Sequence, residues 1–516
     1  MYFSLKKAGV IPLISTVALP LFAIGNEAEA ATERPNILYI MSDDHAAQAI
    51  SAYGGMLAKI LPTPNIDRIG NEGAILQQCF VTNSISTPSR ATCLTGEYSH
   101  RNGVYTLSDA LDTNHPNVAK ELQKAGYQTA IFGKWHLRNK PTGFDDYNVL
   151  PGQGEYINPV FIEKGNWEGQ DGNKGNEGKK YEGHVTDITA QMTLDYLKKT
   201  EKDKPFFVMC HFKAPHRNWI PAERFKDLFK NITIPEPTNL LDTYEGKGEQ
   251  AQLLRMRLED MKKNDVKEDI PTGLSRDDLR HWVYQRYMKD YLRCVAGVDE
   301  SVGELLKYLD DNGLAQNTIV IYTSDQGFYL GEHGFFDKRL MYEESLHTPF
   351  LIRYPKEIKP KTVNKDMTVN IDFAPLFMDY AGLSKPIYMQ GESFRKNLIG
   401  KTPPDWRKSI YYRYWMNADN AHNVTSHYGI RTERYKLIFF YGRTLGMSGS
   451  KKEDRLPEWE MYDIQSDPME MFNIYPKMAN SSLVKKLKID LLNLKKQYGD
   501  KDSKYPEMKT VLEKYW

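Results

Sequence analysis

Four apolar runs along the chain each end abruptly in polar residues. The runs are continuous rather than alternating, which is typical of parallel strands that are buried on both faces. They occupy residues 34–44 (RPNILYIMSDD), 127–137 (YQTAIFGKWHL), 204–216 (KPFFVMCHFKAPH) and 317–327 (NTIVIYTSDQG). Ligands of parallel sheets gather at the carboxyl ends of the strands. Because Asp, Lys, His and Asp follow the four runs, we expect a functional site at that edge of the sheet.

Helical patterns lie between these strands. Residues 115–126 (HPNVAKELQKAG) predict a helix that stops at Gly126, and residues 291–313 (YLRCVAGVDESVGELLKYLDDNG) predict one that ends at Gly313. Strands that alternate with helices favour an α/β fold with a mainly parallel, mixed sheet flanked by helices. We assign residues 31–400 to this large N-terminal domain.

The pattern changes after about residue 400. Polar and aromatic residues then alternate between turn signals, which predicts an antiparallel sheet, in residues 409–415, 427–442 and 458–468. A Lys- and Leu-rich helix follows at residues 481–499. We therefore expect residues 401–516 to form a smaller C-terminal α+β subdomain.

Two segments lack a helical or strand period. Residues 163–183 are rich in Gly, Asn and Lys, and we interpret them as an excursion or lid-like loop. Residues 232–275 are charged and interrupted by prolines, which favours a surface insertion.

Residues 1–30 differ in composition from the rest of the chain. Lys6 and Lys7 precede an apolar run, and Ala28 and Ala30 form a small-residue motif before Ala31. This order is typical of a secretory signal peptide, although an uncleaved anchor helix is the alternative. Prolines interrupt the run, which is also short for a bilayer span. We expect an exported protein, periplasmic or secreted, without stable membrane insertion once the signal is removed.

The overall charge excludes one class of partner. Lys and Arg total 68 against 67 for Asp and Glu, so the formal net charge is only +1 and there is no basic footprint for nucleic acid. The cysteines, Cys79, Cys93, Cys210 and Cys294, show no metal-binding spacing. One disulfide is possible in an oxidising compartment, but we expect buried thiols.

Acidic residues recur at two of the strand ends. Asp43 and Asp44 follow the first run, and Asp325 and Gln326 follow the last. Carboxylate and carboxamide oxygens without thiols suit calcium or magnesium rather than zinc. Each aspartate could instead cap a helix.

Histidines and cations follow the other two strands. His136 lies near Lys134, and His216 lies near Lys213. A single histidine is usually structural, but two at strand ends beside cations indicate proton transfer next to a bound anion. Lys338 and Arg339 extend this cationic set, although a solvated turn would explain them equally well.

The stretch NSISTPSRATCLTG, residues 83–96, resembles the signature of the type I sulfatases. Ser86, Pro88 and Arg90 take the signature positions, and the resemblance extends from about residue 34 to the chain end. It implies an alkaline-phosphatase-like fold. It also implies that a maturase oxidises Ser86 to formylglycine, an aldehyde whose hydrate has a second hydroxyl with which to expel sulfate.

The same resemblance implies a calcium site. Its ligands would be Asp43, Asp44, Asp325 and Gln326, with oxygens from formylglycine 86 and from the sulfate. Gln326 departs from the pattern, because many members have Asn there. Gln still offers a carbonyl oxygen on a longer arm.

The remaining catalytic roles are likewise implied by the resemblance. Arg90 would hold the formylglycine, and Lys134 and Lys338 would grip sulfate oxygens. His216 would protonate the leaving alcohol, and His136 would take the proton from the second hydroxyl.

The substrate class rests on residues 322–355, which resemble the branch containing N-acetylglucosamine-6-sulfatases, above all in the element DKR-x-x-Y-E. The candidates for binding the sulfated glycan are Lys134, His216 and Lys338, together with Asp337, Arg339 and His427. A packing or ion-pair role is the alternative for the last three. Rival functions are a uronic acid 2-O-sulfatase, a phosphonate or phosphodiester hydrolase, and a non-catalytic sulfoglycan-binding protein.

Overall fold

The computed structural model describes residues 34–168 and 178–516, together with residues 1, 2, 4, 5 and 9. Contacts divide the chain into Met1–Glu33 and Arg34–Trp516, and the fold is that of the second unit. Most of the predicted signal peptide and the centre of the predicted loop at 163–183 lie outside the described residues. The flanks of that loop form the strands β6 (Val160–Glu163) and β7 (Lys179–Lys180), which pair antiparallel.

A ten-stranded mixed sheet forms the centre of the unit. Its order is β11-β2-β10-β9-β1-β8-β4-β5-β6-β7, and the five strands from β9 to β5 are mutually parallel. Those five are β9 (Thr318–Ser324), β1 (Asn36–Ser42), β8 (Phe206–His211), β4 (Gln128–Lys134) and β5 (Asp146–Leu150). The outer strands are β10 (Phe350–Arg353), β2 (Ala74–Leu76) and β11 (Thr362–Asn364). The predicted mainly parallel, mixed sheet is confirmed.

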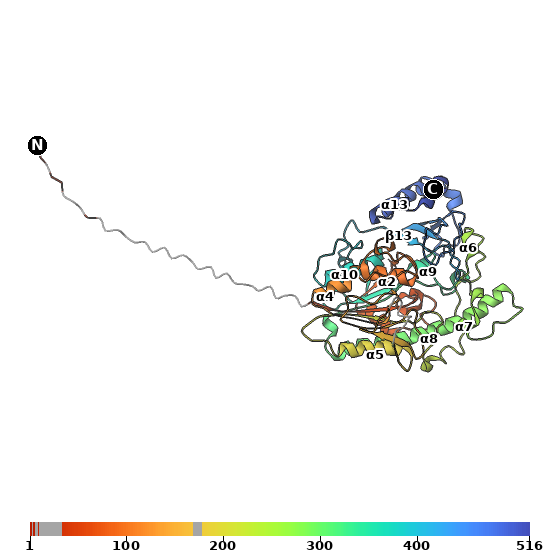
Figure 1. Ribbon diagram of the computed structural model, residues 1–516, viewed down its shortest axis with the longest axis horizontal. Helices are drawn as coiled ribbons and strands as arrows, with labels where there is room; N and C mark the ends of the chain where they lie inside the picture. Colours follow the sequence, from red (N-terminus) through yellow and green to blue (C-terminus); the bar gives the residue numbers. More distant parts are fainter. Residues whose placement is uncertain (3, 6–8, 10–33, 169–177) are drawn as a thin grey trace. The chain divides into compact units, whose positions relative to one another are not determined.

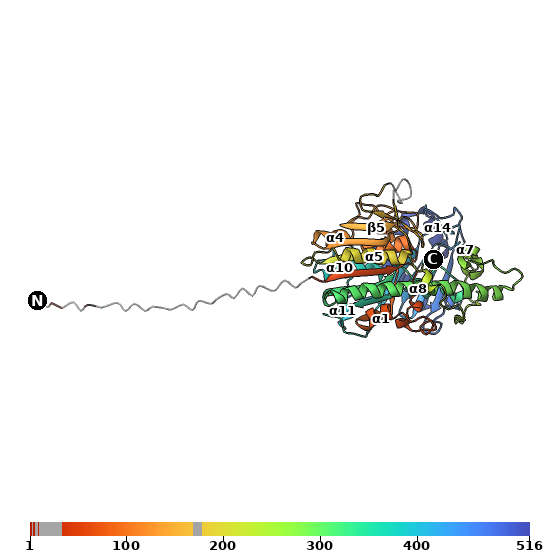
Figure 2. The ribbon, with the colours of Figure 1, turned by 90° about the horizontal axis from the view of Figure 1, so that it is seen from below.

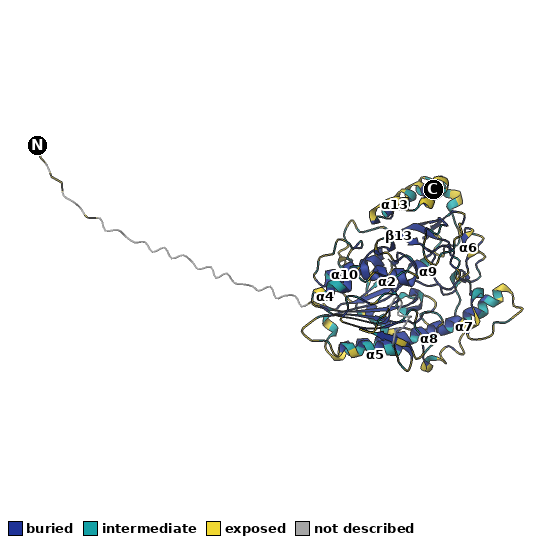
Figure 3. Ribbon diagram, in the orientation of Figure 1, coloured by how far each residue is buried: buried dark blue, intermediate teal, exposed yellow. Residues whose placement is uncertain are grey.

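Helices cover both faces of this sheet, so that it is almost wholly buried (Figures 1, 2 and 3). One layer contains α1 (Pro64–Asn71), α5 (Val185–Leu197) and α8 (Arg276–Asp311), and the other contains α2 (Ser86–Thr95), α4 (Val118–Lys124) and α10 (Phe373–Tyr380). The predicted helix at 291–313 is the second half of α8, which begins earlier because the Ser275 side chain accepts a hydrogen bond from the Asp278 amide.

A separate four-stranded antiparallel sheet lies in the C-terminal part of the chain. It consists of β13 (Ser409–Tyr414), β14 (His427–Thr432), β15 (Tyr435–Phe440) and β16 (Glu458–Asp463), and the helices α13 (Ser482–Tyr498) and α14 (Pro506–Tyr515) follow it. Aromatic contacts fill its core; the rings of Phe439 and Trp459, for example, stack with centroids 4.4 Å apart. This confirms the predicted antiparallel sheet, while the boundary at residue 400 stays a prediction.

Short elements complete the fold. They are the paired strands β3 (Cys79–Phe80) and β12 (Thr368–Val369) and the helices α3 (Ser99–Asn102), α6 (Gln250–Leu253), α7 (Lys263–Val266), α9 (Glu343–Leu346), α11 (Arg395–Leu398) and α12 (Tyr475–Met478). The cysteines are buried and unpaired, as expected. Among the described residues, no helix combines the length and apolar character that a membrane crossing requires.

The segment 232–275, expected to be a surface insertion, is exposed over much of its length but also contributes residues to the interior. Leu240, Tyr244, Met256 and Leu258 are buried, and the Tyr244 ring stacks on Phe335 with centroids 5.2 Å apart. The apolar residues are scattered between charges, so no period marks them. The segment thus packs beside the loops that follow β9.

Candidate active site

The carboxyl end of β1 brings Asp43 and Asp44 into the interior. Neighbouring residues of a strand point to opposite faces, but Asp44 adopts a left-handed conformation with φ of 64°, which turns the chain. Its amide donates a hydrogen bond to Asp325 Oδ1 at 3.1 Å, and its carbonyl accepts one from the Tyr291 hydroxyl at 2.7 Å. The backbone at this strand end is therefore fixed, and both carboxylates are almost fully buried.

The end of β9 lies beside them because β1 and β9 pair in parallel up to Ser42 and Ser324. Gln326 Nε2 lies 2.5 Å from Asp44 Oδ1 and 2.7 Å from Asp325 Oδ1, while Gln326 Oε1 is buried without a hydrogen-bond partner. The amide nitrogen thus occupies a position between carboxylates that would suit a cation. With the amide turned over, Oε1 would face the same point.

The charges of this cluster also favour a cation. Burial, and next the charge of Asp43, raise the pKa of Asp325 to about 7. The pKa of Asp44 rises to about 6, mainly by burial and in spite of Lys338. Burial opposes ionisation of Asp43 as well, but Lys134, His216 and Arg90 hold the pKa of Asp43 well below its usual range. Oxygen donors that repel one another fit a hard divalent ion.

Ser86 is the first residue of α2, and its hydroxyl donates a hydrogen bond to Asp43 Oδ1 at 3.2 Å. Arg90 lies one turn later on the same face of the helix. Its Nε donates to Asp325 Oδ2 at 3.1 Å and its Nη1 to the Lys134 carbonyl at 2.9 Å. Pro88 fits the first turn, where its missing amide hydrogen would have no helical acceptor. Ser86 and Arg90, four residues apart, thus share one face of the helix, whereas Pro88 lies on the opposite face.

Two lysines lie against the aspartates. Lys134 ends β4, and its Nζ contacts Asp43 Oδ2 and, at 2.6 Å, Gln153 Oε1. Lys338 Nζ lies 2.6 and 2.7 Å from the two oxygens of Asp44. Both ammonium groups are buried, so an anion that entered here would meet two weakly hydrated cations.

The two predicted histidines reach the same cluster. His216 Nε2 lies 3.8 Å from Asp44 Oδ2, and its Nδ1 lies 2.7 Å from the Arg217 carbonyl. His136 Nδ1 lies 3.4 Å from the Thr87 hydroxyl. Burial, and then the charge of Lys134, hold the pKa of both histidines well below the usual range. A bound anion would oppose the effect of the lysine and raise these pKa values.

Asp337 and Arg339 form a group beside Lys338. The Lys338 amide donates to Asp337 Oδ1 at 2.8 Å, and Arg339 Nε lies 3.3 Å from the same oxygen. His422, which the sequence did not single out, places Nε2 3.3 Å from Asp337 Oδ2. Burial would raise the pKa of Asp337, but His422, Lys338 and Arg339 together hold it well below its usual range.

His427 is not brought to this group. It lies in β14, fully buried, with its ring centroid 5.7 Å from that of Tyr412 and 4.9 Å from that of Phe440. The Tyr412 hydroxyl, in turn, donates to the Arg339 carbonyl at 2.5 Å. His427 thus packs one aromatic layer behind the residues it was expected to join.

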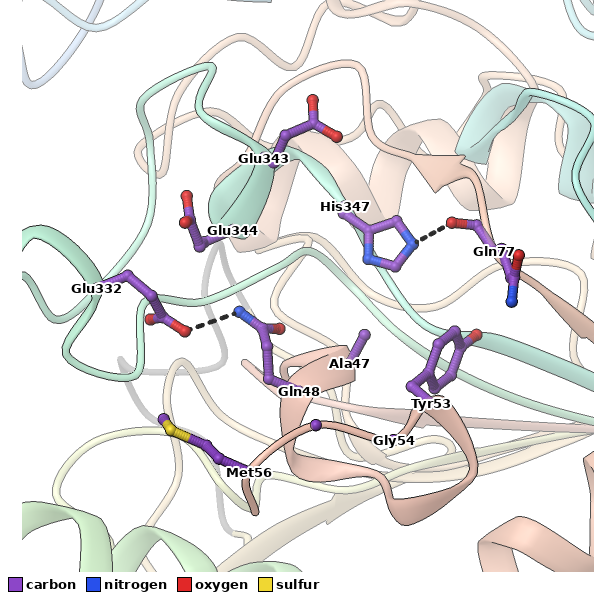
Figure 4. A pocket seen from close by; sticks show the side chains of 11 residues that line it. Ala47, Gln48, Tyr53, Gly54, Met56, Gln77, Glu332, Glu343, Glu344 and His347 are labelled. Atoms are coloured by element: carbon purple, nitrogen blue, oxygen red, sulfur yellow. Dashed lines mark hydrogen bonds between the residues drawn. The ribbon is translucent and has the colours of Figure 1, made fainter. Parts of the chain in front are cut away.

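A cavity of about 440 Å³ lies beyond the short 3₁₀ turn Ala47–Ala49 (Figure 4). Glu332, Glu343 and Glu344 line it, together with Gln48 and His347, and none of the predicted site residues does. No Lys or Arg lines it. An acidic cavity repels an anion, so this cavity does not suit a sulfate group.

Comparisons with known proteins show the family. Residues 35–383 match the model of the Sulfatase family, and residues 331–497 match that of the N-sulphoglucosamine sulphohydrolase C-terminal region. An N-acetylglucosamine-6-O-sulfatase of Bacteroides thetaiotaomicron is 42% identical, with 99% of this chain and 96% of the relative covered. The N-acetylglucosamine-6-sulfatase of Homo sapiens is 27% identical over 77% of this chain and 70% of its own length.

A solved structure supports the same relationship. It is described as a complex with its substrate D-glucosamine-2-N,6-O-disulfate. The TM-score is 0.83 at 40% sequence identity, and the match covers 91% of this chain and 99% of the other.

Proposed function

This chain belongs to the sulfatase family of sulfuric ester hydrolases, and on that premise we propose that it removes the 6-O-sulfate of N-acetylglucosamine in sulfated glycans. The observation that carries the proposal is the 42% identity to an N-acetylglucosamine-6-O-sulfatase over 99% of the chain. A relative of similar identity whose described substrate is a 6-O-sulfated glucosamine supports it further.

Asp43, Asp44, Asp325 and Gln326 would hold one calcium ion. The unpartnered Gln326 oxygen and the mutual repulsion of the carboxylates support this assignment. The ion, when bound, would neutralise charge on the sulfate oxygens. An all-oxygen donor set is the reason for preferring calcium to a transition metal.

Ser86 would be converted to formylglycine by a maturase that reads the surrounding signature. Its hydrate supplies a nucleophile and a second hydroxyl through which sulfate can leave. Arg90 would hold this group, since its buried Nη2 has no hydrogen-bond partner and lies 3.8 Å from Asp43 Oδ1. The exported location, periplasmic or secreted, belongs to the same proposal.

Lys134 and Lys338 would bind the sulfate oxygens, and the two histidines would move protons. His216 would donate a proton to the leaving sugar oxygen from Nε2, because its Nδ1 hydrogen is used by the Arg217 carbonyl. His136 would accept the proton of the second hydroxyl of residue 86, beside Thr87.

Asp337, Arg339 and His422 would contact the hydroxyls of the sugar. They adjoin Lys338 and combine an acceptor, a planar donor and an imidazole. Because this group is held together by its own ion pairs, it can meet a neutral sugar without rearrangement.

The direct test is sulfate release from the 6-sulfates of N-acetylglucosamine, N-acetylgalactosamine and galactose, and from a 2-O-sulfated uronic acid. We expect the first to be hydrolysed at least about fivefold faster than the others, since a lost sugar hydrogen bond costs about 1 kcal/mol or more. A preference for the uronic acid, or for aryl phosphate over aryl sulfate, would favour a rival function.

Peptide mass spectrometry of Ser86 completes the test. Loss of two hydrogens marks formylglycine, and Ser86→Ala should have no turnover. An unmodified Ser86 in a protein that binds but does not cleave the glycan would identify a binding protein instead.

A further inference from the structure

Gln153 lies among the site residues without a role in the scheme above. It follows β5, the fifth parallel strand, in the turn Pro151-Gly152-Gln153-Gly154. Gly152 and Gly154 have φ values of 52° and 66°, conformations that favour glycine, and they turn the chain back toward the neighbouring strand β4. Gln153 is an exposed residue, but its side-chain oxygen is directed to the end of β4, where it meets Lys134.

The contact between the two side chains is short and specific. Lys134 Nζ donates to Gln153 Oε1 at 2.6 Å. The Gln153 backbone is fixed as well, because its carbonyl accepts a hydrogen bond from Lys213 Nζ at 3.0 Å. Lys213 is buried and lies over the Tyr156 ring, and the Tyr156 hydroxyl donates to the His216 carbonyl at 2.5 Å. One connected set of contacts therefore holds Gln153 and His216.

The other partner of Lys134 is not dedicated to it. Asp43 also accepts the Ser86 hydroxyl and lies 3.8 Å from Arg90 Nη2, so its carboxylate is shared among three groups. An anionic partner also cancels part of the positive charge that a sulfate would need. A neutral carboxamide oxygen orients the ammonium group and leaves its charge available.

We infer that Gln153 is a positioning residue, which orients Lys134 toward the sulfate group without adding a second negative charge beside it. The inference rests on the proposed sulfatase function for its biological meaning. It identifies the element P-G-Q-G after β5 as part of the anion site, in addition to the four strand ends named from the sequence.

Two near-isosteric variants separate this role from a space-filling one. Gln153→Met keeps the volume and removes the acceptor, so kcat/KM should fall about threefold to tenfold, the usual worth of one hydrogen bond. Gln153→Glu keeps volume and acceptor but adds a negative charge beside Lys134, so kcat/KM should fall by about a hundredfold or more. A space-filling role predicts that both variants behave like the wild type. Gln191→Glu, on the exposed side of α5, is the matched control.

Binding of inorganic sulfate, measured by calorimetry, gives a readout independent of turnover. We expect the Kd of sulfate to rise in the order wild type, Gln153→Met, Gln153→Glu, with melting temperatures close to that of the wild type. Equal Kd values, or a Gln153→Glu variant as active as Gln191→Glu, would overturn the inference. If the wild type binds sulfate in this Gln153-dependent way but cleaves no sulfate ester, the proposed function fails while the role of Gln153 stands.

Discussion

Replacing His216 by alanine tests how the proposed leaving-group chemistry arises from the geometry. Nδ1 lies 2.7 Å from the Arg217 carbonyl, which can only accept, so that nitrogen carries a hydrogen. Nε2 is then the atom that gains and loses a proton, and it lies 3.8 Å from Asp44 Oδ2 at the edge of the cluster. Burial and Lys134 hold the pKa of His216 well below its usual range, so the substrate's own negative charge is needed to protonate it.

The size of the effect depends on the leaving group. A sugar alcohol is a poor leaving group, and general-acid catalysis contributes about 10²- to 10⁴-fold to such reactions. This corresponds to about 3–5 kcal/mol of transition-state stabilisation. Nitrophenolate leaves without a proton, so its release should lose only the part that His216 contributes to positioning, about tenfold or less. We expect His216→Ala to lower kcat by these different factors.

The assay compares N-acetylglucosamine 6-sulfate with 4-nitrophenyl sulfate in the wild type and in His216→Ala. His281→Ala is the matched control, because His281 is half-exposed, pairs with Glu236 and lies outside the cluster. Equal losses on the two substrates would refute the assignment of His216 as the general acid. If His281→Ala also lowered kcat more for the sugar sulfate than for 4-nitrophenyl sulfate, the effect could not be assigned to the position of His216.

Three further outcomes follow from other parts of the molecule. His422→Ala should raise the KM of the sugar sulfate about tenfold and leave that of 4-nitrophenyl sulfate unchanged, because His422 contacts Asp337 and not the sulfate lysines; equal effects on both would contradict this. Removal of divalent ions by a chelator should abolish activity and lower the melting temperature, with recovery on addition of calcium, and an unaffected enzyme would exclude the metal. Asp500 is buried against Arg413 and Lys495, and these cations hold its pKa far below the usual range although burial opposes this. The stabilisation that ionised Asp500 gives to the folded protein should therefore be complete above a pH of about 4 and decline below it. In urea titrations, Asp500→Asn should be less stable than the wild type by about 3 kcal/mol at pH 7, and this difference should shrink in acid.

The parts of the fold that the sequence reveals are those with a strong local period. β1, β4, β8 and β9 are continuous apolar runs because helices cover both faces, and each was placed correctly for that reason. The buried residues of the segment 232–275, such as Tyr244 and Met256, could not be identified in this way because they lie in an irregular stretch between charged, exposed residues. Burial without a period leaves no local signal.

The site residues also differ in how far the sequence predicts their positions. Asp43, Lys134, His216 and Asp325 follow the four predicted strands, and parallel pairing makes their proximity a consequence of topology. Topology does not predict in the same way whether His422 or His427 lies beside Asp337. Both lie in the C-terminal part of the chain, in stretches with similar composition, and strand register decides the outcome.

Strand register explains why His427 does not lie beside Asp337. His427 pairs with Tyr414 and Phe440 across β14, so its side chain shares the interior face of the antiparallel sheet. His422 precedes the strand, in a loop where the Asp419 carboxylate accepts its amide hydrogen at 2.9 Å and contacts its Nδ1 at the same distance. The Asp419 carboxylate fixes the ring at Nδ1, and Nε2 then faces Asp337 Oδ2 at 3.3 Å. The motif Asp419-x-x-His422 is therefore the local feature that distinguishes the histidine beside Asp337 from the histidine packed in the sheet.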